Sequence, residues 1–242
     1  MKLRFWLFAI FTMVMIGVLV ALGTWQMERL AWKQALIAEL NTKLSAQPIE
    51  LPPRERWGGL TPAADEFRRV AFSAEFIPGE EALVYSSGSA LRPDAAGPGY
   101  WVFSPARLTG GSIVVVNRGF VPEGKQAANQ HAQPSGVVNL VGSLRWPEAR
   151  GLFTPKDDLA KGLWFARDPA AMAAAKNWGA VAPFYVDQEA PVPPGGLPKA
   201  GPLRASLTNN HLQYAVTWYG LAFVMLVAAL VFWRSRRRAV GK

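Results

Sequence analysis

The stretch FWLFAIFTMVMIGVLVALGTW, from Phe5 to Trp25, and the stretch YAVTWYGLAFVMLVAALVFW, from Tyr214 to Trp233, decide the organisation of this chain. Neither stretch contains a charged residue. At about 1.5 Å of rise per residue, each makes a helix of about 30 Å, which matches the hydrocarbon core of a bilayer. In lipid, a single segment satisfies its backbone hydrogen bonds only as a helix. The sequence therefore predicts two transmembrane helices, one near each end.

The basic residues predict which side of the membrane each part of the chain occupies. Of the 26 lysines and arginines, seven flank the two apolar stretches on the outside, and the rest lie between the stretches with all 17 acidic residues. Positive flanks favour the cytoplasm, so the tails 1–4 and 234–242 are expected there, and the region 26–213 in the periplasm of a bacterial inner membrane. Because these tails carry most of the net charge of +9, we do not interpret the basic character as nucleic-acid binding. The seven flanking residues are Lys2, Arg4, Arg234, Arg236, Arg237, Arg238 and Lys242.

A cleaved signal peptide is the alternative interpretation of the first apolar stretch. Its basic start would be Lys2 and Arg4, and Ala21-Leu22-Gly23 has small residues at the spacing of a cleavage site. However, the stretch is longer than the usual signal core, and Trp25 stands where an interfacial aromatic residue belongs. The helical pattern also continues beyond Trp25. We therefore expect a retained anchor.

The composition narrows the possible chemistry. Cysteine is absent, which excludes disulfides, thiolate metal sites, iron–sulfur clusters and cysteine nucleophiles. The two histidines, His131 and His211, are too few for a histidine-rich metal site within one chain. The acidic residues form no paired motif, and no Ser/His/Asp or phosphate-loop pattern occurs. We therefore expect a protein that is not an enzyme.

The region between the two stretches predicts a helix and then a β-rich domain. The juxtamembrane helix is expected over about 26–44, because large apolar residues recur every four positions before prolines end the pattern. Residues 48–66 are interpreted as a linker with turns. Alternating apolar runs separated by glycine, proline and asparagine then predict an antiparallel sheet or barrel within about 67–190. The expected strands are Arg69–Phe76, Ala82–Ser86, Tyr100–Ser104, Ser112–Asn117, Val137–Arg145, Leu163–Arg167 and Phe184–Asp187.

Two features are expected near the end of this region. Asp168 followed by Pro169 predicts the start of a helix that runs to about Asn177, with Gly179 as its stop. The segment 191–202 is rich in proline and glycine and is expected to be an extended connector back to the membrane. The predicted fold class is thus a membrane α+β protein: two transmembrane helices that flank a β-rich antiparallel periplasmic domain with one or two helices.

The start of the second apolar stretch carries an unusual histidine. On a helix, His211, Tyr214, Ala215 and Trp218 share one face, with Asn210 and Thr217 beside it. A histidine at the edge of a membrane span is costly if it faces lipid, and this suggests a function or a specific partner. The plainer interpretation is an interfacial side chain that reaches the headgroups or hydrogen-bonds the first helix.

The end of the first apolar stretch carries a second polar and aromatic set. If the two helices pair antiparallel, Trp25, Gln26 and Arg29 come level with His211 and Tyr214. A stripe of small residues, Gly17, Ala21 and Thr24, is expected to be the face on which the second helix packs. Haem is a plausible ligand of such a cluster, because imidazole is a common axial ligand and arginine pairs with propionates. Lys33 is expected near the headgroups with Arg29.

Three segments resemble the Surfeit locus protein 1 family of cytochrome oxidase assembly factors. The resemblance covers nearly the whole chain in order, spacing and two-span layout. It implies an inner-membrane protein that assists subunit I of a haem–copper oxidase, with haem a synthase as a further partner. It also implies haem a binding, with His211 as the iron ligand. The segments are LGTWQMERLAWK (22–33), VVNRGFVP (115–122) and NNHLQYAVTWY (209–219).

The chain departs from the family pattern at two positions, and a third residue has two interpretations. The family usually has Trp where this chain has Phe120, and Gly where this chain has Glu75. Asn117-Arg118-Gly119 is interpreted as the end of a strand and a turn, in which Gly119 supplies a positive φ. Arg118 either locks this turn by a salt bridge or binds a propionate or a partner.

Two functions follow from the sequence and the resemblance. The first is an assembly factor that holds haem a, or the haem-loaded subunit, at the membrane surface. Its expected binding residues are His211, Tyr214, Trp218, Trp25, Gln26 and Arg29. The second is a scaffold that holds oxidase subunits together without a cofactor.

Overall fold

The computed structural model describes residues 2–127, 131–204 and 208–240. The chain divides into two units, which are named here the helix pair (residues 1–38 and 208–242) and the barrel domain (residues 39–207). Parts of the predicted features lie outside the described residues: Lys242 in the basic tail, and residues 128–130 in the loop before His131.

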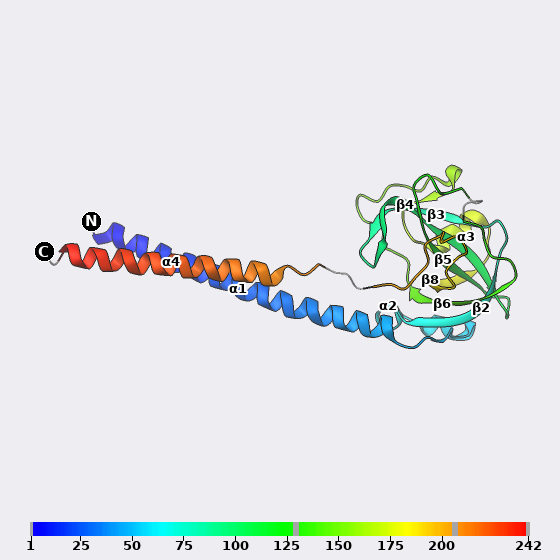
Figure 1. Ribbon diagram of the computed structural model, residues 1–242, viewed down its shortest axis with the longest axis horizontal. Coiled ribbons are helices and arrows are strands. Elements are labelled where there is room, and N and C mark those ends of the chain that lie inside the picture. Colours follow the sequence, from blue (N-terminus) through cyan, green and yellow to red (C-terminus); the bar gives the residue numbers. More distant parts are fainter. Residues whose placement is uncertain (1, 128–130, 205–207, 241–242) are drawn as a thin grey trace. The chain divides into compact units, whose positions relative to one another are not determined.

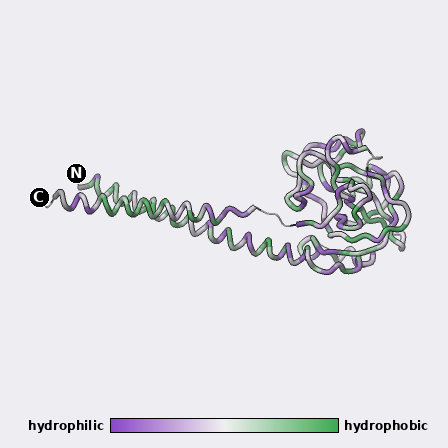
Figure 2. The backbone as a smooth tube through the Cα atoms, viewed as in Figure 1, coloured by the Kyte–Doolittle hydropathy of each residue, from purple (hydrophilic) through white to green (hydrophobic). Residues whose placement is uncertain are grey.

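The helix pair consists of α1 (Lys2–Ser45) and α4 (His211–Val240) (Figure 1). Both helices are long and apolar enough to cross a membrane. Figure 2 shows the hydrophobic residues concentrated in the parts of α1 and α4 near the chain termini. The two predicted apolar helices are present, and α1 continues without a break into the predicted juxtamembrane segment. Residues 39–45 of this helix belong to the barrel domain.

The two helices run antiparallel, as expected. Near the chain termini, the rings of Phe8 and Phe232 lie 5.8 Å apart. Further along the pair, Thr24 Oγ1 and Tyr219 Oη are 3.1 Å apart and share a hydrogen bond. Contacts between early residues of α1 and late residues of α4, and the reverse, are possible only when the two chain directions are opposed.

The face of α1 that packs on α4 agrees with the predicted stripe of small residues at Thr24, which bonds Tyr219, and differs from it at the other two positions. Gly17 and Ala21 are exposed, whereas Leu19 and Gly23 are buried. The reason is the size of Tyr219: a Cβ atom on Gly23 would lie 2.7 Å from the tyrosine ring. The large ring needs a position without a side chain, and Gly23, not Gly17, lies opposite it, which sets the rotation of α1.

The barrel domain is built from strands and short helices whose order is shown in Figure 1. Pairings in the order β2-β6-β8-β5-β4 form a ring, which the β2–β4 pairing closes. Strands β3, β7 and β1 extend this barrel at its edges. The strands are β1 (Ile49–Glu50), β2 (Arg69–Phe76), β3 (Ala82–Ser89), β4 (Arg92–Leu108), β5 (Ile113–Pro122), β6 (Val137–Arg145), β7 (Leu163–Trp164) and β8 (Val181–Ala190). The short helices are η1 (Arg54–Gly59), α2 (Pro62–Asp65), η3 (Leu159–Lys161) and α3 (Pro169–Lys176).

The barrel is mixed, which corrects the prediction of an antiparallel sheet. The β5–β8, β3–β7 and β1–β2 pairs are parallel, and the other pairs are antiparallel. Between β5 and β8 the chain passes through β6, β7 and α3, so it returns beside β5 by a crossover instead of a hairpin. Short apolar runs predict the strands correctly, but they do not encode the direction in which distant strands pair.

Several predicted strand ends are also wrong, because glycines that were interpreted as turns lie within strands. β5 continues through Gly119 to Pro122, and β4 begins before Gly99. A Cβ atom on Gly99 would collide with the Phe120 ring, and one on Gly119 with the Lys199 carbonyl. These glycines allow close approach inside the sheet.

Two segments interpreted as free connectors are packed on the barrel. In the segment 48–66, Trp57 is buried with its ring 5.4 Å from that of Phe184. In the segment 191–202, Lys199 exchanges two backbone hydrogen bonds with Phe120, of 2.8 and 3.2 Å. Both segments therefore contribute to the stability of the barrel domain.

The helix α3 begins and ends about where it was predicted, but the residue that stops it is Asn177 instead of Gly179. The Asp168 side chain accepts hydrogen bonds of 3.0 Å from the amides of Ala170 and Ala171, as an N-cap does. Asn177, with φ of 57°, is the left-handed residue that ends the helix, two positions before the predicted Gly179. Asparagine tolerates this conformation better than most residues, because its side chain can hydrogen-bond locally.

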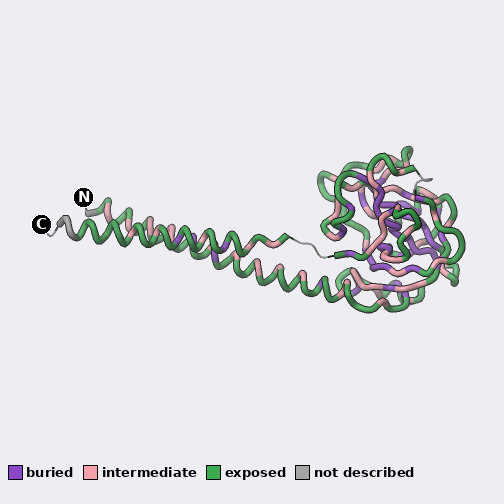
Figure 3. Tube along the Cα trace, viewed as in Figure 1, coloured by how far each residue is buried: buried purple, intermediate pink, exposed green. Residues whose placement is uncertain are grey.

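Buried residues gather inside the barrel, whereas most of α1 and α4 is exposed (Figure 3). The largest core cluster is rich in aromatic residues. Tyr185 lies in it, and burial raises the pKa of its phenol. The exposed apolar surface of the helix pair is the surface expected of a segment whose solvent is lipid. The other aromatic members of the cluster are Trp101, Phe103, Phe120, Trp164 and Trp178.

Candidate functional site

The helix pair brings His211 against Gln26. His211 is the first residue of α4, and its Nδ1 lies 2.6 Å from the Gln26 Oε1 atom of α1. An amide oxygen only accepts hydrogen bonds, so the imidazole donates from Nδ1. The proton therefore belongs to Nδ1, and the lone pair of the neutral ring is on Nε2.

The second ring nitrogen of His211 is available. Among the described residues, Nε2 has no hydrogen-bond partner, and the side chain is partly exposed. Metal-ligating histidines in proteins commonly donate from one nitrogen to a fixed acceptor and bind through the other. Gln26 is such an acceptor, because it lies within the continuous helix α1.

The other predicted site residues lie on the same two helices, and none of the described ones has a hydrogen bond or a ring contact with His211. Tyr214 and Trp25 are each about half exposed, and Trp218 is less exposed than either. No hydrogen bond or ring contact joins them to the imidazole in the described part of the chain. Arg29 stacks on its own helix, with its guanidinium carbon 4.8 Å from the centre of the Trp32 ring. The structure thus brings together Gln26 and His211, and leaves the aromatic faces and the cation open beside them.

Sequence reasoning assigned no role to Tyr219 and did not predict the hydrogen-bond partners of Thr24 and Lys33. Tyr219 fits over Gly23 and bonds Thr24, and Lys33 donates a hydrogen bond to the Thr208 carbonyl. A large tyrosine in the second apolar stretch and a glycine level with it in the first would have indicated this contact. The bond from Lys33 was not predictable, because its acceptor is a backbone carbonyl just before α4.

The motif Asn117-Arg118-Gly119 lies in the barrel domain and is buried there. Asn117 Nδ2 donates to Asp187 Oδ1 at 2.6 Å, which links β5 to β8. Arg118 donates from Nη2 to the carbonyls of His131 and Ala132, at 3.1 and 2.7 Å. Burial lowers the pKa of the Arg118 guanidinium, which Glu81, 4.0 Å away, partly offsets. The structure supports a role for Arg118 in holding a loop, through carbonyl groups more than through a salt bridge.

The two positions at which the chain differs from the family pattern both lie in the barrel domain. Phe120 is fully buried, and its ring packs 5.3 Å from that of Trp101 in a T-shaped contact. Glu75 is exposed on β2, so its side chain meets solvent. Neither position belongs to the helix pair that contains His211.

His131 is a buried structural residue. Its side chain is almost fully buried, and its Nε2 lies 3.0 Å from the Gln126 carbonyl. From the sequence alone, His131 belongs to a polar loop, residues 127–134, and its replacement is predicted to change neither bound haem nor active oxidase. Because the structure buries it beside Arg118, its replacement is expected to disturb the domain, and it is unsuitable as a neutral control.

Comparison with known proteins identifies relatives along most of the chain. A sequence profile described as the SURF1 family matches residues 13–223. The SURF1-like protein of Monosiga brevicollis is 36% identical over 231 residues, which cover 89% of this chain and 83% of the relative. The Surfeit locus protein 1 of Rattus norvegicus is 36% identical over 214 residues, covering 83% of this chain and 67% of the relative. That of Homo sapiens is 34% identical over 216 residues, covering 83% and 69%. The chain therefore belongs to the SURF1 family.

Proposed function

We propose that this protein is an assembly factor for a haem–copper oxidase and holds haem a during the maturation of subunit I. The observation that carries the proposal is the His211 imidazole, which is anchored through Nδ1 to Gln26 and has a free lone pair on Nε2. A side chain held in this way is prepared to bind a metal. Membership of the SURF1 family supports the connection to oxidase assembly.

The residues around His211 suit a haem group. When bound, haem would supply an iron atom, and His211 would hold it through the lone pair on Nε2. Trp25, Tyr214 and Trp218 offer partly exposed aromatic faces to a flat apolar ring. Arg29 keeps its in-plane N–H donors while it stacks on Trp32, so it can pair with a propionate.

We further propose that α1 and α4 span a bacterial inner membrane and that the barrel domain is periplasmic. The support is the distribution of charge, because the basic tails carry no acidic residue and positive flanks remain on the cytoplasmic side. Retention of the first helix is supported by its role in the pair, since Gly23 and Thr24 both contact Tyr219. Reporter fusions test this placement. A cytoplasmic reporter is expected to be active at residue 242, and a periplasmic reporter near residue 130.

A second function, a scaffold without cofactor, is favoured by one observation. The hydrogen bond of 2.6 Å from His211 to Gln26 is also what a purely structural link between two membrane helices would form. Under this alternative, the protein would hold subunit I, or haem a synthase with subunit I, through its exposed surfaces. Neither function requires catalysis, and we propose that the protein is not an enzyme.

The two functions are separated by the spectrum of the purified protein. The full chain is co-expressed with a haem a synthesis pathway, purified in detergent, and examined for a Soret band. We expect a band in the wild type and its loss in His211→Ala. Leu212→Ala is the matched control, because Leu212 is exposed on the same turn of α4 and has no polar role. Equal haem content in wild type and His211→Ala would remove His211 as the ligand, and no band in either would favour the scaffold.

A further inference from the structure

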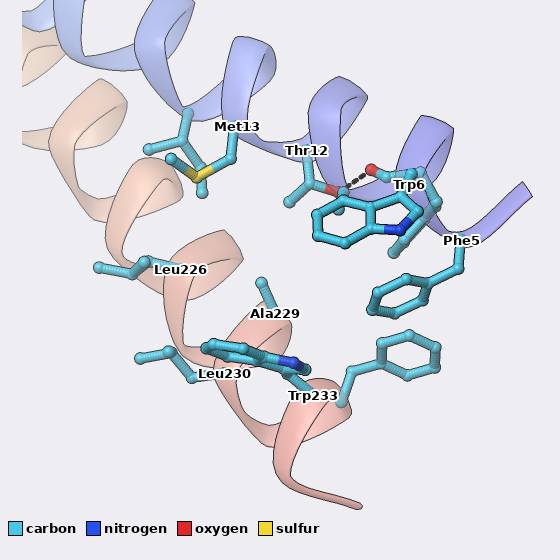
Figure 4. A pocket seen from close by; sticks show the side chains of 12 residues that line it. Phe5, Trp6, Thr12, Met13, Leu226, Ala229, Leu230 and Trp233 are labelled. Carbon is cyan, nitrogen blue, oxygen red and sulfur yellow. Dashed lines mark hydrogen bonds between the residues drawn. The ribbon is translucent and has the colours of Figure 1, made fainter. Parts of the chain in front are cut away.

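An apolar groove lies between α1 and α4 near the chain termini, far along the helices from His211. Its volume is about 260 Å³, and only apolar side chains and Thr12 line it. Figure 4 shows Phe5, Trp6 and Met13 of α1 opposite Leu226, Ala229 and Trp233 of α4. On α1 the lining extends from Phe5 to Ile16, about 16 Å along the helix axis. An elongated apolar groove of this length fits part of an acyl chain.

Two arginines lie at the end of the groove near the chain termini and contact its aromatic walls. The guanidinium carbon of Arg236 lies 5.0 Å from the ring centre of Phe5 and 5.9 Å from that of Phe232. That of Arg237 lies 4.2 Å from the ring centre of Trp233. These rings belong to the wall of the groove, so the stacking places both cations beside its lining.

Within the part of the chain that the structure describes, neither arginine forms an ion pair with a carboxylate. The sequence contains no Asp or Glu in residues 1–27 or 208–242, so no acidic side chain from these ranges is available to pair with them. Stacking uses the face of a guanidinium and leaves its in-plane N–H groups free, in the fork that binds a phosphate through two hydrogen bonds. The missing anion is therefore expected from outside the chain.

We propose that the groove and the two arginines form a binding site for one anionic phospholipid. An acyl chain occupies the groove, and the headgroup phosphate accepts hydrogen bonds from Arg236 and Arg237. Basic pockets between membrane helices are a known way of binding anionic headgroups. The inference rests on the proposed placement of α1 and α4 in a membrane and is independent of haem. It goes beyond oxidase assembly, because it makes the lipid a component of the helix pair.

The test compares two lipids that have the same acyl chains. The full chain is purified in detergent and mixed with phosphatidylglycerol or phosphatidylcholine, and bound lipid is measured by native mass spectrometry. We expect phosphatidylglycerol to bind about tenfold more tightly, since each arginine near the surface attracts an anionic lipid. Equal binding of the two lipids would overturn the proposal. Insertion into phosphatidylcholine vesicles is measured separately, and failure to insert would contradict the membrane placement itself.

Paired variants separate a defined site from diffuse attraction. Arg236→Gln with Arg237→Gln is expected to abolish the preference for phosphatidylglycerol. Arg4→Gln with Arg234→Gln removes the same charge from exposed positions. This double variant is expected to retain most of the preference for phosphatidylglycerol. If both double variants lose the preference equally, the attraction is diffuse and the site does not exist.

Two further variants keep the proposal testable if loss of charge alters insertion. Phe5→Leu with Trp233→Leu keeps every charge but removes the rings under the two guanidinium groups, and is expected to reduce the preference severalfold. Ala229→Phe fills the groove and is expected to weaken binding of phosphatidylglycerol severalfold. Val227→Phe, outside the groove, is its matched control and is expected to bind as the wild type does. Unchanged binding in Ala229→Phe would contradict an acyl chain in the groove.

Discussion

One histidine of this chain is buried and the other is partly exposed, and the interior of the barrel domain and the surface of the helix pair differ in the same way. In the barrel domain, His131 is buried, with a backbone carbonyl on Nε2 and Arg118 against its own carbonyl. In the helix pair, His211 is partly exposed, has one nitrogen fixed by Gln26 and leaves the other free. A buried polar group that holds its neighbours is expected to serve stability. A fixed but accessible one is free to bind a ligand, so we expect replacement of His131 to affect stability and replacement of His211 to affect the proposed ligand binding.

The largest expected effect is on the barrel. Gly119 has a φ of 131°, and a Cβ atom there would collide with the Lys199 carbonyl. We expect Gly119→Val to destabilise the domain by about 4 kcal/mol or more, measured by urea unfolding of the full chain in micelles. Gly110→Ala is the matched control, because nothing lies within 4 Å of its Cβ position. A Gly119→Val protein as stable as this control would show that the segment 191–202 is not packed on β5.

The second prediction compares how replacement of each histidine changes the stability of the barrel domain. His131→Ala is expected to lower the free energy of unfolding of the barrel by about 2 kcal/mol, since it leaves a gap and an unpaired carbonyl in a buried cluster. His211→Ala is expected to leave barrel unfolding unchanged, because His211 belongs to the other unit. The measurement is again urea unfolding. Equal losses of unfolding free energy in the two variants would contradict the different roles assigned to His131 and His211.

The third prediction concerns the group that orients His211. Gln26→Ala removes the acceptor of the Nδ1 proton, and we expect haem affinity to fall about tenfold, as for other partners of metal-bound histidines. Gln26→Glu retains an acceptor oxygen and is expected to restore most of the affinity. Haem titration followed by the Soret band measures both. Wild-type affinity in Gln26→Ala would mean that the imidazole is not oriented by α1.

The smallest effect is expected from the contact between the helices. Tyr219→Phe removes the hydrogen bond to Thr24 but keeps the ring over Gly23. Hydrogen bonds between membrane helices contribute about 0.6 kcal/mol. We therefore expect the free energy of unfolding of the helix pair, measured by thermal denaturation, to fall by that amount. Gly23→Leu, which clashes with the ring, is expected to cost clearly more. If the two substitutions are equivalent, packing at Gly23 does not set the rotation of α1.

The sequence by itself determined those parts of the protein that depend on local chemistry. The two apolar helices, the continuous juxtamembrane helix and the start of α3 at Asp168 follow from hydropathy, helical spacing and capping. Strands β2 and β6 have the predicted bounds. Antiparallel pairing of the helices and the meeting of Gln26 with His211 were also predictable, because opposed helices fix which residues are level.

Only the tertiary structure decided the features that depend on residues far apart in the sequence. The parallel pairing of β5 with β8, the packing of Trp57 and Lys199 on the barrel, and the burial of His131 depend on such contacts. Gly99 and Gly119 had the signature of turns, yet they lie within strands, because another residue occupies the space of the missing Cβ. Gly23 took the place of the predicted Gly17 stripe for the same reason, since the Tyr219 ring fits only over a residue without a side chain. The sequence shows where each glycine lies, but only the fold shows which neighbouring residue occupies the space of its missing Cβ.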